Sequence, residues 1–480
     1  MGGYSAFDSK PFERRALGSF YTPNVVAERL INQILDKVVI QKSINTLTIC
    51  DPFCGDGRLL SSIALKLRNR MPSLQIFIEG WDKDKSAIEQ AEKKIQRLFS
   101  ADNFVEWNFI NCDSFHQANE NSPKFKVVIT NPPWETIKPD WRELKQFTDE
   151  EKNEIKSELR NLDNLLAENF PISQPSRKFA GWGTNLSRVG LELSLSILNT
   201  NGVLGIVMPS SYFADMTSQP LREHLFSNYS LTNVTYYPAE YRLFDQVDVE
   251  FATCIVVNSQ NDDKLKFEAY SESGVINQGS IKRTQKTLSL LDGNLPIRLG
   301  AAPYKIFEKI QRHPSLCEIN HENSFTTWGG REMDETRIKE KFIPKNGIKI
   351  MFSRDMERFG IRTETESLNQ IPEHYATKSS AYPRIIWRDI ARPSMKRRMN
   401  ATVLEEGIIT GNSLGVLHLG NCDEKCLLSL LGVMNSLVFE YQIRAKLATN
   451  HITWGVIRKL KIPSMETLLL NKVDKIVERI

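Results

Sequence analysis

The sequence lacks the cysteine framework that staples small secreted domains. Seven cysteines are spread over 480 residues, an odd number without a tight spacing pattern, which is typical of a reducing compartment. Cys422 and Cys426 stand four residues apart, but a structural zinc ion needs four ligands, and no second Cys or His pair with zinc-site spacing accompanies them. We therefore expect no metal site.

The sequence also lacks a long apolar run. The first ten residues contain no basic segment followed by an apolar core, so we expect no secretory signal. The longest apolar stretch, 426–439, includes Asn435 and Ser436 and is too short to span a bilayer. We expect a buried helix there, and we place the protein in the cytoplasm with no membrane partner.

A strong charge imbalance and internal repeats are missing as well. The formal net charge is +4, with 41% hydrophobic and 25% charged residues, which are ordinary values for a globular protein. An interaction with a polyanion would therefore depend on local clusters of basic residues. The length suits two or three domains with a sizeable core.

The first half of the chain alternates apolar runs with helical patterns. The expected strands are 46–51, 74–82, 104–113, 125–131, 201–209 and 249–257, of which the last can run antiparallel. This alternation predicts an α/β fold with a doubly wound, mainly parallel sheet and helices on both faces.

Two departures from this alternation divide the chain. Residues 135–185 form an insertion, which is either a mobile or partner-contacting segment or a plain solvated helix. Beyond about residue 290 the alternation ends, and Pro, Gly and Arg punctuate shorter elements. We therefore expect one domain over 1–285 and an α+β domain over 286–480.

Polar residues stand at the ends of the expected strands, where ligands bind in an open parallel sheet. After the first strand, Gly55 and Gly57 allow a tight turn and the close approach of a ligand, with Asp51 at the strand tip. The spacing departs from Gly-x-Gly-x-x-Gly, and Asp56 inside the turn disfavours a pyrophosphate. We expect a neutral or cationic ligand here. The alternative is a glycine-rich turn that serves compactness alone.

The second and third strand ends carry further acids. Asp82 can accept hydrogen bonds from ribose hydroxyls, or it can cap a helix over 83–98, and Glu79 is a weaker substitute. Asp113 can accept a hydrogen bond from an exocyclic adenine amine while Phe115 covers the ring. A single acid after a strand is usually only a turn residue. Asp113 is a candidate ligand contact because it is the third in a series of polar residues at strand ends.

The fourth expected strand ends in Asn131, Pro132, Pro133 and Trp134. Two prolines keep the backbone extended and cannot continue a central strand. The Asn131 side-chain oxygen and the Pro132 carbonyl can then accept both hydrogens of a planar amine, which exposes its lone pair, while Trp134 offers a flat wall for its ring. This is catalysis by positioning and electrostatics. The alternative is a proline-stiffened turn with a core tryptophan.

Taken in this order, the motifs resemble those of S-adenosylmethionine-dependent DNA amino-methyltransferases. The resemblance is greatest to the N6-adenine members of the gamma, TaqI-like class, which occur in restriction–modification systems. The loop around Phe53 is similar to the cofactor loop of that family, Asp82 to its ribose-binding acid, and Asp113 with Phe115 to its adenine contacts. Residues 131–134 resemble the catalytic tetrapeptide, whose fourth residue is aromatic.

Two further segments resemble motifs of the same family. The match at residues 18–30 implies three residues at the methionine end of the cofactor: Phe20, Tyr21 and Thr22. Residues 242–257 resemble the segment that supplies a second ring against the flipped base. By that match we nominate Phe244, with Tyr241 as the alternative.

The resemblance implies a Rossmann-like methyltransferase domain followed by a target-recognition domain. The cofactor would be S-adenosyl-L-methionine, the substrate double-stranded DNA, and the reaction methyl transfer to N6 of a flipped adenine. A separate restriction endonuclease would be a partner. An RNA or protein-amide methyltransferase is the alternative enzyme, although the large C-terminal domain argues against the latter. A non-catalytic DNA-binding subunit would require a damaged catalytic motif.

The C-terminal half contains a basic cluster with interleaved aromatic residues. Clustered Lys and Arg contact phosphates, and Arg also reads guanine edges, although a charge run is more often a solvated face. Segments 382–414 and 430–463 resemble parts of recognition domains in the family. The residues expected to contact DNA are Arg384, Trp387, Arg388, Arg392, Lys396, Arg397 and Arg398.

Overall fold

The chain forms two compact units, Met1–Ala301 and Ala302–Ile480, hereafter the first and the second unit. The computed structural model describes residues 22–477 apart from 40–44, 122–124, 141–143, 176–177, 179–180, 245–248, 261–263, 285–292, 300–302, 319–326, 335–337, 358–359, 393–394, 421–422 and 448–449.

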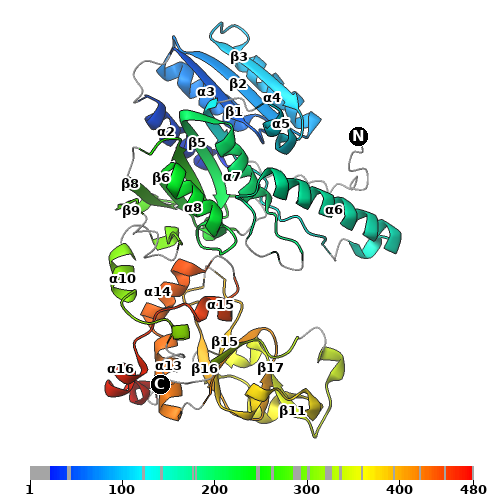
Figure 1. The fold of residues 1–480 in the computed structure, drawn as a ribbon, viewed down its shortest axis with the longest axis vertical. Helices are drawn as coiled ribbons and strands as arrows, with labels where there is room; N and C mark the ends of the chain where they lie inside the picture. Colours follow the sequence, from blue (N-terminus) through cyan, green and yellow to red (C-terminus); the bar gives the residue numbers. More distant parts are fainter. Residues whose placement is uncertain are drawn as a thin grey trace. The chain divides into compact units, whose positions relative to one another are not determined.

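A nine-stranded sheet forms the centre of the first unit, with the strand order β3-β2-β1-β4-β5-β7-β6-β8-β9 (Figure 1). Neighbouring strands from β3 to β5 run parallel, and β7 runs antiparallel to both β5 and β6. The mainly parallel sheet and its antiparallel late strand are thus confirmed. The strands are β1 (Thr46–Asp51), β2 (Gln75–Asp82), β3 (Val105–Asn111), β4 (Phe125–Thr130), β5 (Leu198–Pro209), β6 (Ser230–Tyr237), β7 (Phe251–Val257), β8 (Lys264–Ser271) and β9 (Gly274–Lys282).

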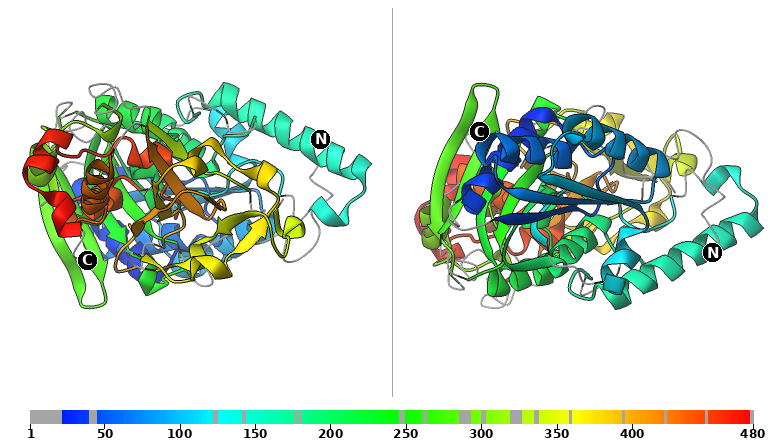
Figure 2. Two further views of the ribbon diagram at one scale, coloured as in Figure 1. Left: turned by 90° about the horizontal axis from the view of Figure 1, so that it is seen from below. Right: turned by 90° about the horizontal axis from the view of Figure 1, so that it is seen from above.

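Helices cover both faces of this sheet, as expected (Figure 2). On one face α2, α3 and α4 contact one another in turn, and on the other face α5 contacts α7. The helices are α2 (Asn24–Val39), α3 (Arg58–Arg70), α4 (Lys85–Phe99), α5 (Ser114–Asn121), α6 (Asp149–Asn169), α7 (Leu186–Ser196) and α8 (Gln219–Asn228).

The packing of α2 shows how the sequence builds this layer. Its apolar residues recur every three or four positions, and the resulting stripe is buried against β5 and β7. Gly205 on β5 lies directly below, and a Cβ there would come within 2.4 Å of Ile34 Cδ1. The missing side chain therefore lets α2 lie close to the sheet.

The second unit is an α+β structure around an antiparallel sheet of the order β10-β18-β15-β16. Helices pack on one face of this sheet, and a three-stranded sheet, β14-β11-β17, packs on the other. The elements are α10 (Pro303–Ile310), β10 (Thr327–Gly330), β11 (Ile348–Met351), β12 (Met356–Glu357), β13 (Gly360–Ile361), β14 (Asn369–Ile371), β15 (Arg384–Arg388), β16 (Ala401–Leu404), β17 (Ile408–Thr410), β18 (Leu414–Leu419), α13 (Glu424–Met434), α14 (Leu437–Lys446), α15 (Trp454–Ile457), α16 (Met465–Leu470) and α17 (Val473–Val477).

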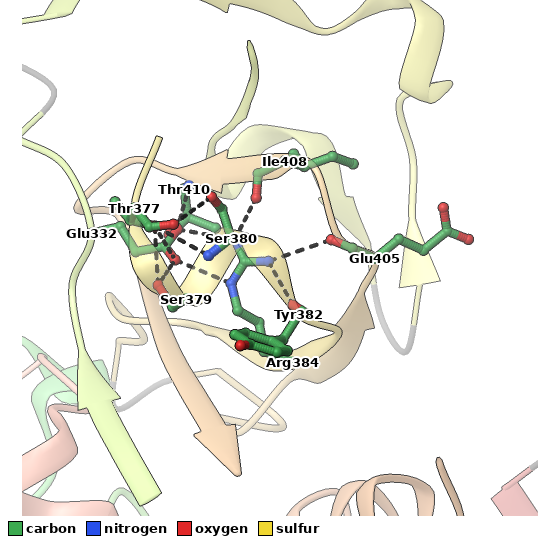
Figure 3. A network of polar contacts seen from close by, with 9 residues as sticks. All are labelled: Glu332, Thr377, Ser379, Ser380, Tyr382, Arg384, Glu405, Ile408 and Thr410. Atoms are coloured by element: carbon green, nitrogen blue, oxygen red, sulfur yellow. Dashed lines mark hydrogen bonds and ion pairs between the residues drawn. The ribbon is translucent and has the colours of Figure 1, made fainter. Parts of the chain in front are cut away.

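A buried ion pair joins the two sheets of the second unit (Figure 3). Neither Arg384 nor Glu332 exposes any side-chain surface, and Nη2 of the guanidinium lies 3.1 Å from the carboxylate. Glu332 also accepts hydrogen bonds from the Ser379 hydroxyl and from the backbone N–H and hydroxyl of Thr410. The Arg384 side chain is therefore completely buried and bonded to groups in the interior of the second unit.

The apolar stretch at 426–439 forms two helices instead of the single helix that was expected. Asn435 breaks it, because its amide exchanges hydrogen bonds with the backbone of Ala401, and Ser436 then caps α14. In the described part of the chain, no single helix is long and apolar enough to cross a membrane. Only α13 and α14 together, bent by 60°, meet that test by length and composition.

Candidate functional site

The loop after β1 holds its shape through its own aspartate and two glycines. Asp51 is buried, and its Oδ1 accepts a hydrogen bond of 3.0 Å from the Phe53 N–H. Gly55 and Gly57 have φ values of 51° and 69°, in the left-handed region that favours glycine. A Cβ at Gly57 would lie 2.8 Å from the Ala91 Cβ, so this position also lets α3 and α4 approach each other.

Asp82 at the tip of β2 is tied to the same loop. Its Oδ2 accepts a hydrogen bond of 2.8 Å from the Gly55 N–H, and its Oδ1 accepts one of 2.9 Å from the Asp84 N–H. The expectation that Asp82 caps the next helix is wrong, because Asp84 is the N-cap and accepts from Ser86 and Ala87. The Asp82 carboxylate is therefore directed at the glycine loop.

Burial controls the charge of these two carboxylates. It raises the pKa of Asp51 to about 7, against the lowering effect of the hydrogen bond from the Phe53 N–H. Burial also raises the pKa of Asp82, and the backbone N–H groups of Asp84 and Gly55 oppose that shift. A cationic ligand would stabilise the ionised form of both groups.

Aromatic rings line the adjoining strand ends. Asp113 follows β3, is partly exposed, and accepts a hydrogen bond of 3.0 Å from the Phe115 N–H. The Phe115 ring lies 5.3 Å from that of Phe53, measured between centroids. Phe170, from the end of the insertion, packs edge-on against Phe115 at 6.0 Å.

The Asn131–Trp134 segment follows β4 directly, and β4 pairs with β1. The order of the strands reverses between β1 and β4, which is the usual ligand position in such sheets. Gly190 of α7 supports the segment, since a Cβ there would lie 2.4 Å from the Pro132 Cβ and 3.3 Å from a Phe53 ring carbon. Pro132 and Phe53 of the glycine loop therefore both lie against Gly190.

Trp134 is anchored in a cluster of aromatic rings. Its ring lies 5.3 Å from Phe244 and 6.0 Å from Phe251, and Phe244 is buried. Tyr241, the alternative to Phe244, packs edge-on against Tyr270 instead. The contact between Phe244 and Trp134 is compatible with the expected role at a flipped base, which stays a prediction.

The chain leaving Trp134 is fixed to the start of α7. Asn185 donates a hydrogen bond of 3.2 Å to the Trp134 carbonyl and caps α7 by accepting from two backbone N–H groups. Thr136 forms a β-bridge with Asn185, and the Glu135 carbonyl accepts a hydrogen bond of 2.8 Å from the Leu186 N–H. Both ends of the insertion are thus held together beside the site.

Residues 10–289, more than half of the chain, match the model of the N-6 DNA Methylase family. The chain belongs to the N-6 DNA methylase family. The matched residues contain every strand end described above.

Characterised relatives of this N-6 DNA methylase share part of its sequence. Type II methyltransferase M.VspI of Vibrio sp. (strain 343) is 25% identical over 211 residues, which cover 44% of this chain and 41% of that protein. M.BanIII of Aneurinibacillus aneurinilyticus is 23% identical over 244 residues, covering 46% of this chain and 35% of that protein. The match thus spans less than half the length of these curated relatives.

Solved structures resemble the methylase over nearly its whole length. The Type IIL restriction–modification enzyme MmeI, in complex with DNA, has a TM-score of 0.56 at 11% identity and covers 96% of this chain and 69% of MmeI. The DrdV–DNA complex has a TM-score of 0.51 at 13% identity and covers 98% of this chain and 58% of that chain. These likenesses concern the fold.

Membership of the family implies S-adenosyl-L-methionine as the cofactor, and the described residues fit it. Two buried carboxylates, Asp51 and Asp82, suit a cationic ligand with ribose hydroxyls, and the Phe53 and Phe115 rings suit an adenine. Among the described residues, the buried Trp134 Nε1 has no hydrogen-bond partner, so a polar ligand atom can satisfy it.

The N-terminal part of the expected site is only partly described. Thr22 is buried and lies two residues before the start of α2. Phe20 and Tyr21 lie outside the described residues. Their expected place at the methionine end of the cofactor stays a prediction.

The basic cluster of the second unit divides into interior and surface residues. Arg384, in the ion pair of Figure 3, cannot reach DNA. Trp387 is buried, and its Nε1 donates a hydrogen bond of 2.7 Å to the Ile452 carbonyl. Arg398 is buried, and its Nη2 donates to the Ala391 carbonyl at 2.9 Å. The expectation that these three residues contact DNA is therefore wrong.

The remaining residues of the cluster are accessible. Arg388 is half-buried and donates a hydrogen bond to the Met356 carbonyl. Arg392 and Lys396 are exposed, and Arg397 is half-buried. These four residues stay predicted DNA contacts.

Sequence reasoning missed three residues that support the site. Gly190 interrupts the apolar pattern of α7, which is a signal of close backbone approach. Asn185 stands where an N-cap is expected, directly before the same pattern. Nothing in the sequence around Phe170 indicates that it packs against Phe115.

Proposed function

We propose that the protein is a DNA methyltransferase that modifies N6 of adenine in double-stranded DNA, as the modification component of a restriction–modification system. The observation that supports this most is the Asn131–Trp134 segment at the switch point of the sheet, held against Phe53 of the glycine loop by Gly190. Membership of the N-6 DNA methylase family gives the same substrate atom. The order of the motifs favours the gamma class.

The chain's own residues would position the amine. The Asn131 side-chain oxygen and the Pro132 carbonyl accept the two amine hydrogens, and the prolines fix the direction of both oxygens. Pro133 keeps the following turn extended, and Trp134, braced by Phe244, stacks on the ring of the base. The base must leave the duplex first, at a cost of a few kcal/mol.

S-adenosyl-L-methionine, when bound, supplies an electrophilic methyl group. Asp82 would accept hydrogen bonds from the ribose, and Asp113 and Phe115 would contact the adenine. The ionised Asp51 carboxylate would stabilise the cationic methionine end. Gly55 and Gly57 let the backbone approach the cofactor.

The second unit would supply the binding energy that offsets base flipping, as a target-recognition domain. Lys396 and Arg397 line an open groove of about 670 Å³, and Arg444 holds the Lys396 backbone by a hydrogen bond of 3.2 Å. Exposed cations on a fixed backbone suit phosphate contacts. A separate restriction endonuclease is the proposed partner.

Labelled S-adenosyl-L-methionine offered with duplex DNA, RNA or cell protein tests the substrate class. We expect label in DNA only, at N6 of adenine, and label in RNA or protein alone would support the alternative enzyme. Asn131→Ala should reduce transfer to DNA at least about 100-fold, because a preorganised acceptor of the reacting amine is lost. Near-normal turnover by this variant would refute the assigned role of Asn131.

Cofactor binding by the same variant is the control. Asn131 lies beyond the residues assigned to the ribose and adenine, so we expect the Kd for S-adenosyl-L-methionine to stay within about threefold, which is under 1 kcal/mol. A loss of cofactor binding equal to the loss of activity would instead point to a folding defect.

A further inference from the structure

A half-exposed cluster in the second unit joins Arg331, Asp389 and His451, which come from three separate segments. Arg331 Nη2 lies 2.5 Å from Asp389 Oδ2, and His451 Nδ1 lies 2.5 Å from the same oxygen. Arg331 Nη2 and His451 Nδ1 are 3.3 Å apart. One carboxylate oxygen thus holds a guanidinium and an imidazole side by side.

The exposure of these side chains is unequal. The Asp389 side chain is 2% exposed, whereas Arg331 is 44% and His451 49% exposed. In the Arg384–Glu332 pair, by contrast, both partners are completely buried. Within the described residues Arg331 is engaged only through Nη2, so the second Nη2 hydrogen and the Nη1 or Nε donor beside it remain for a ligand. The Asp389 carboxylate of the cluster is therefore buried, whereas the guanidinium donors of Arg331 are accessible.

The backbone beneath the cluster is rigid. Arg331 directly follows β10, whose four residues pair with β18, and Gly329 of β10 lies against the Trp454 ring. Asp389 directly follows β15, and its backbone N–H and carbonyl are bonded to Ser413 and Ile452. An arginine held this way loses little rotamer entropy when it binds a ligand.

The charges of the cluster decide between two kinds of DNA contact. The Arg331 cation is matched by the Asp389 carboxylate at 2.5 Å, so the pair adds little net charge to attract a phosphate. The pairing uses one Nη2 hydrogen and leaves one adjacent pair of directional N–H donors on the guanidinium. Guanine offers two adjacent acceptors, O6 and N7, which is the edge that a fixed arginine recognises best.

We propose that Arg331 reads a guanine in the recognition sequence, with Asp389 as its positioning residue and His451 beside it. This inference rests on the proposed function, since it concerns the DNA that the methyltransferase would modify. Ile390, whose side chain is 54% exposed, forms a β-bridge with His451 and adds apolar surface next to the Arg331 donors.

The test is methylation of a randomised duplex library by the full-length protein, with modified adenines located by sequencing. We expect a wild-type motif that contains a guanine, and Arg331→Gln should lower the preference for it about 10-fold or more while the other positions are kept. Arg331→Lys keeps the charge but lacks the planar fork, so it should lose the same discrimination. Arg354→Gln, at a 65% exposed arginine of the same unit, should leave the motif unchanged.

Salt titrations of DNA binding separate a base contact from a phosphate contact. For Arg331→Gln we expect an unchanged slope of log Kd against log salt. A uniform loss of affinity with a reduced slope would identify a phosphate contact and overturn the proposal, as would an unchanged motif. A wild-type protein that methylates no DNA would instead refute the proposed function itself.

Discussion

At the strand ends of the large sheet, burial controls the charge of single carboxyl groups. Asp51 is the clearest case, because burial raises the pKa of its carboxyl group to about 7 while the unfolded chain keeps it near the ordinary value. The folded protein therefore holds a proton there that the unfolded chain has released. An ionised Asp51 costs folding free energy, which a bound cation would recover.

Asp51→Asn should stabilise the free protein in a pH-dependent way. The raised pKa of Asp51 makes the wild type lose stability as the pH rises from about 4 to 7. The asparagine side chain does not titrate, so the variant does not lose this stability. The advantage of the variant should therefore grow over that range and stay constant above it, at roughly 4 kcal/mol. Thermal unfolding at pH 5 and pH 8 measures it, and identical pH trends for the two proteins would disprove the argument.

The same substitution should weaken cofactor binding. Ionised Asp51 would pair with the cationic methionine end, so wild-type affinity should rise between pH 6 and pH 8. In Asp51→Asn we expect an affinity at least about 10-fold lower at pH 8, with that rise abolished. Calorimetric titration at both pH values checks this.

The position of a residue was predictable where a strand pattern located it. Asp51 and Asn131 follow apolar runs, so the sequence indicated that their side chains share one sheet edge. Arg384 and Arg398 read as surface charges because their partners are distant in sequence: Glu332 stands 52 residues away, and Glu440 accepts from the Arg398 backbone across 42 residues. Only the fold reveals such pairs.

At the scale of elements, the insertion is more than a solvated helix. Ile155, Asp163 and Leu166 of α6 are buried, and the chain after α6 returns to the site. There the Ile172 and Ser173 N–H groups donate hydrogen bonds to Glu192 of α7 at 3.2 and 2.6 Å. Sequence periodicity predicted the helix, but it held no information on this return.

Phe170→Leu should weaken cofactor binding more than turnover. Leucine keeps most of the packing volume but removes the ring edge that braces Phe115. An aromatic pair is worth about 0.5–1.5 kcal/mol, so we expect the Kd for S-adenosyl-L-methionine to rise roughly 2- to 12-fold with kcat little changed. Phe226→Leu on α8 is the matched control. Equal effects of the two variants would exclude a specific role for Phe170.

At the scale of the whole molecule, the chain pairs a sheet built for a small ligand with a second unit that carries accessible cations. The alternation of strands and helices predicted the first unit well, because each element there is local in sequence. The second unit has short strands paired across long separations, such as β10 with β18, so periodicity gave little more than its class. In the sequence, the boundary between the two units was indicated only by the end of the strand–helix alternation.

Loss of the accessible cations should change the salt dependence of DNA binding. The double substitution Lys396→Gln and Arg397→Gln should weaken binding to all duplex sequences and lower the slope of log Kd against log salt by about 1 to 2. The control is Lys425→Gln, at an exposed lysine in the first turn of α13. An unchanged slope in the double variant would remove this segment from the interface.

The bridge between Thr136 and Asn185 joins the two ends of the insertion, so its outer part can change length without moving the reaction centre. Extra residues at the start of α6, which lies before Phe170 and the hydrogen bonds to Glu192, would add only the slowly growing entropy of a longer loop, about 0.6 kcal/mol per doubling. The start of α6 is therefore a natural graft point, where a foreign module could be inserted without moving the chain that returns to the site.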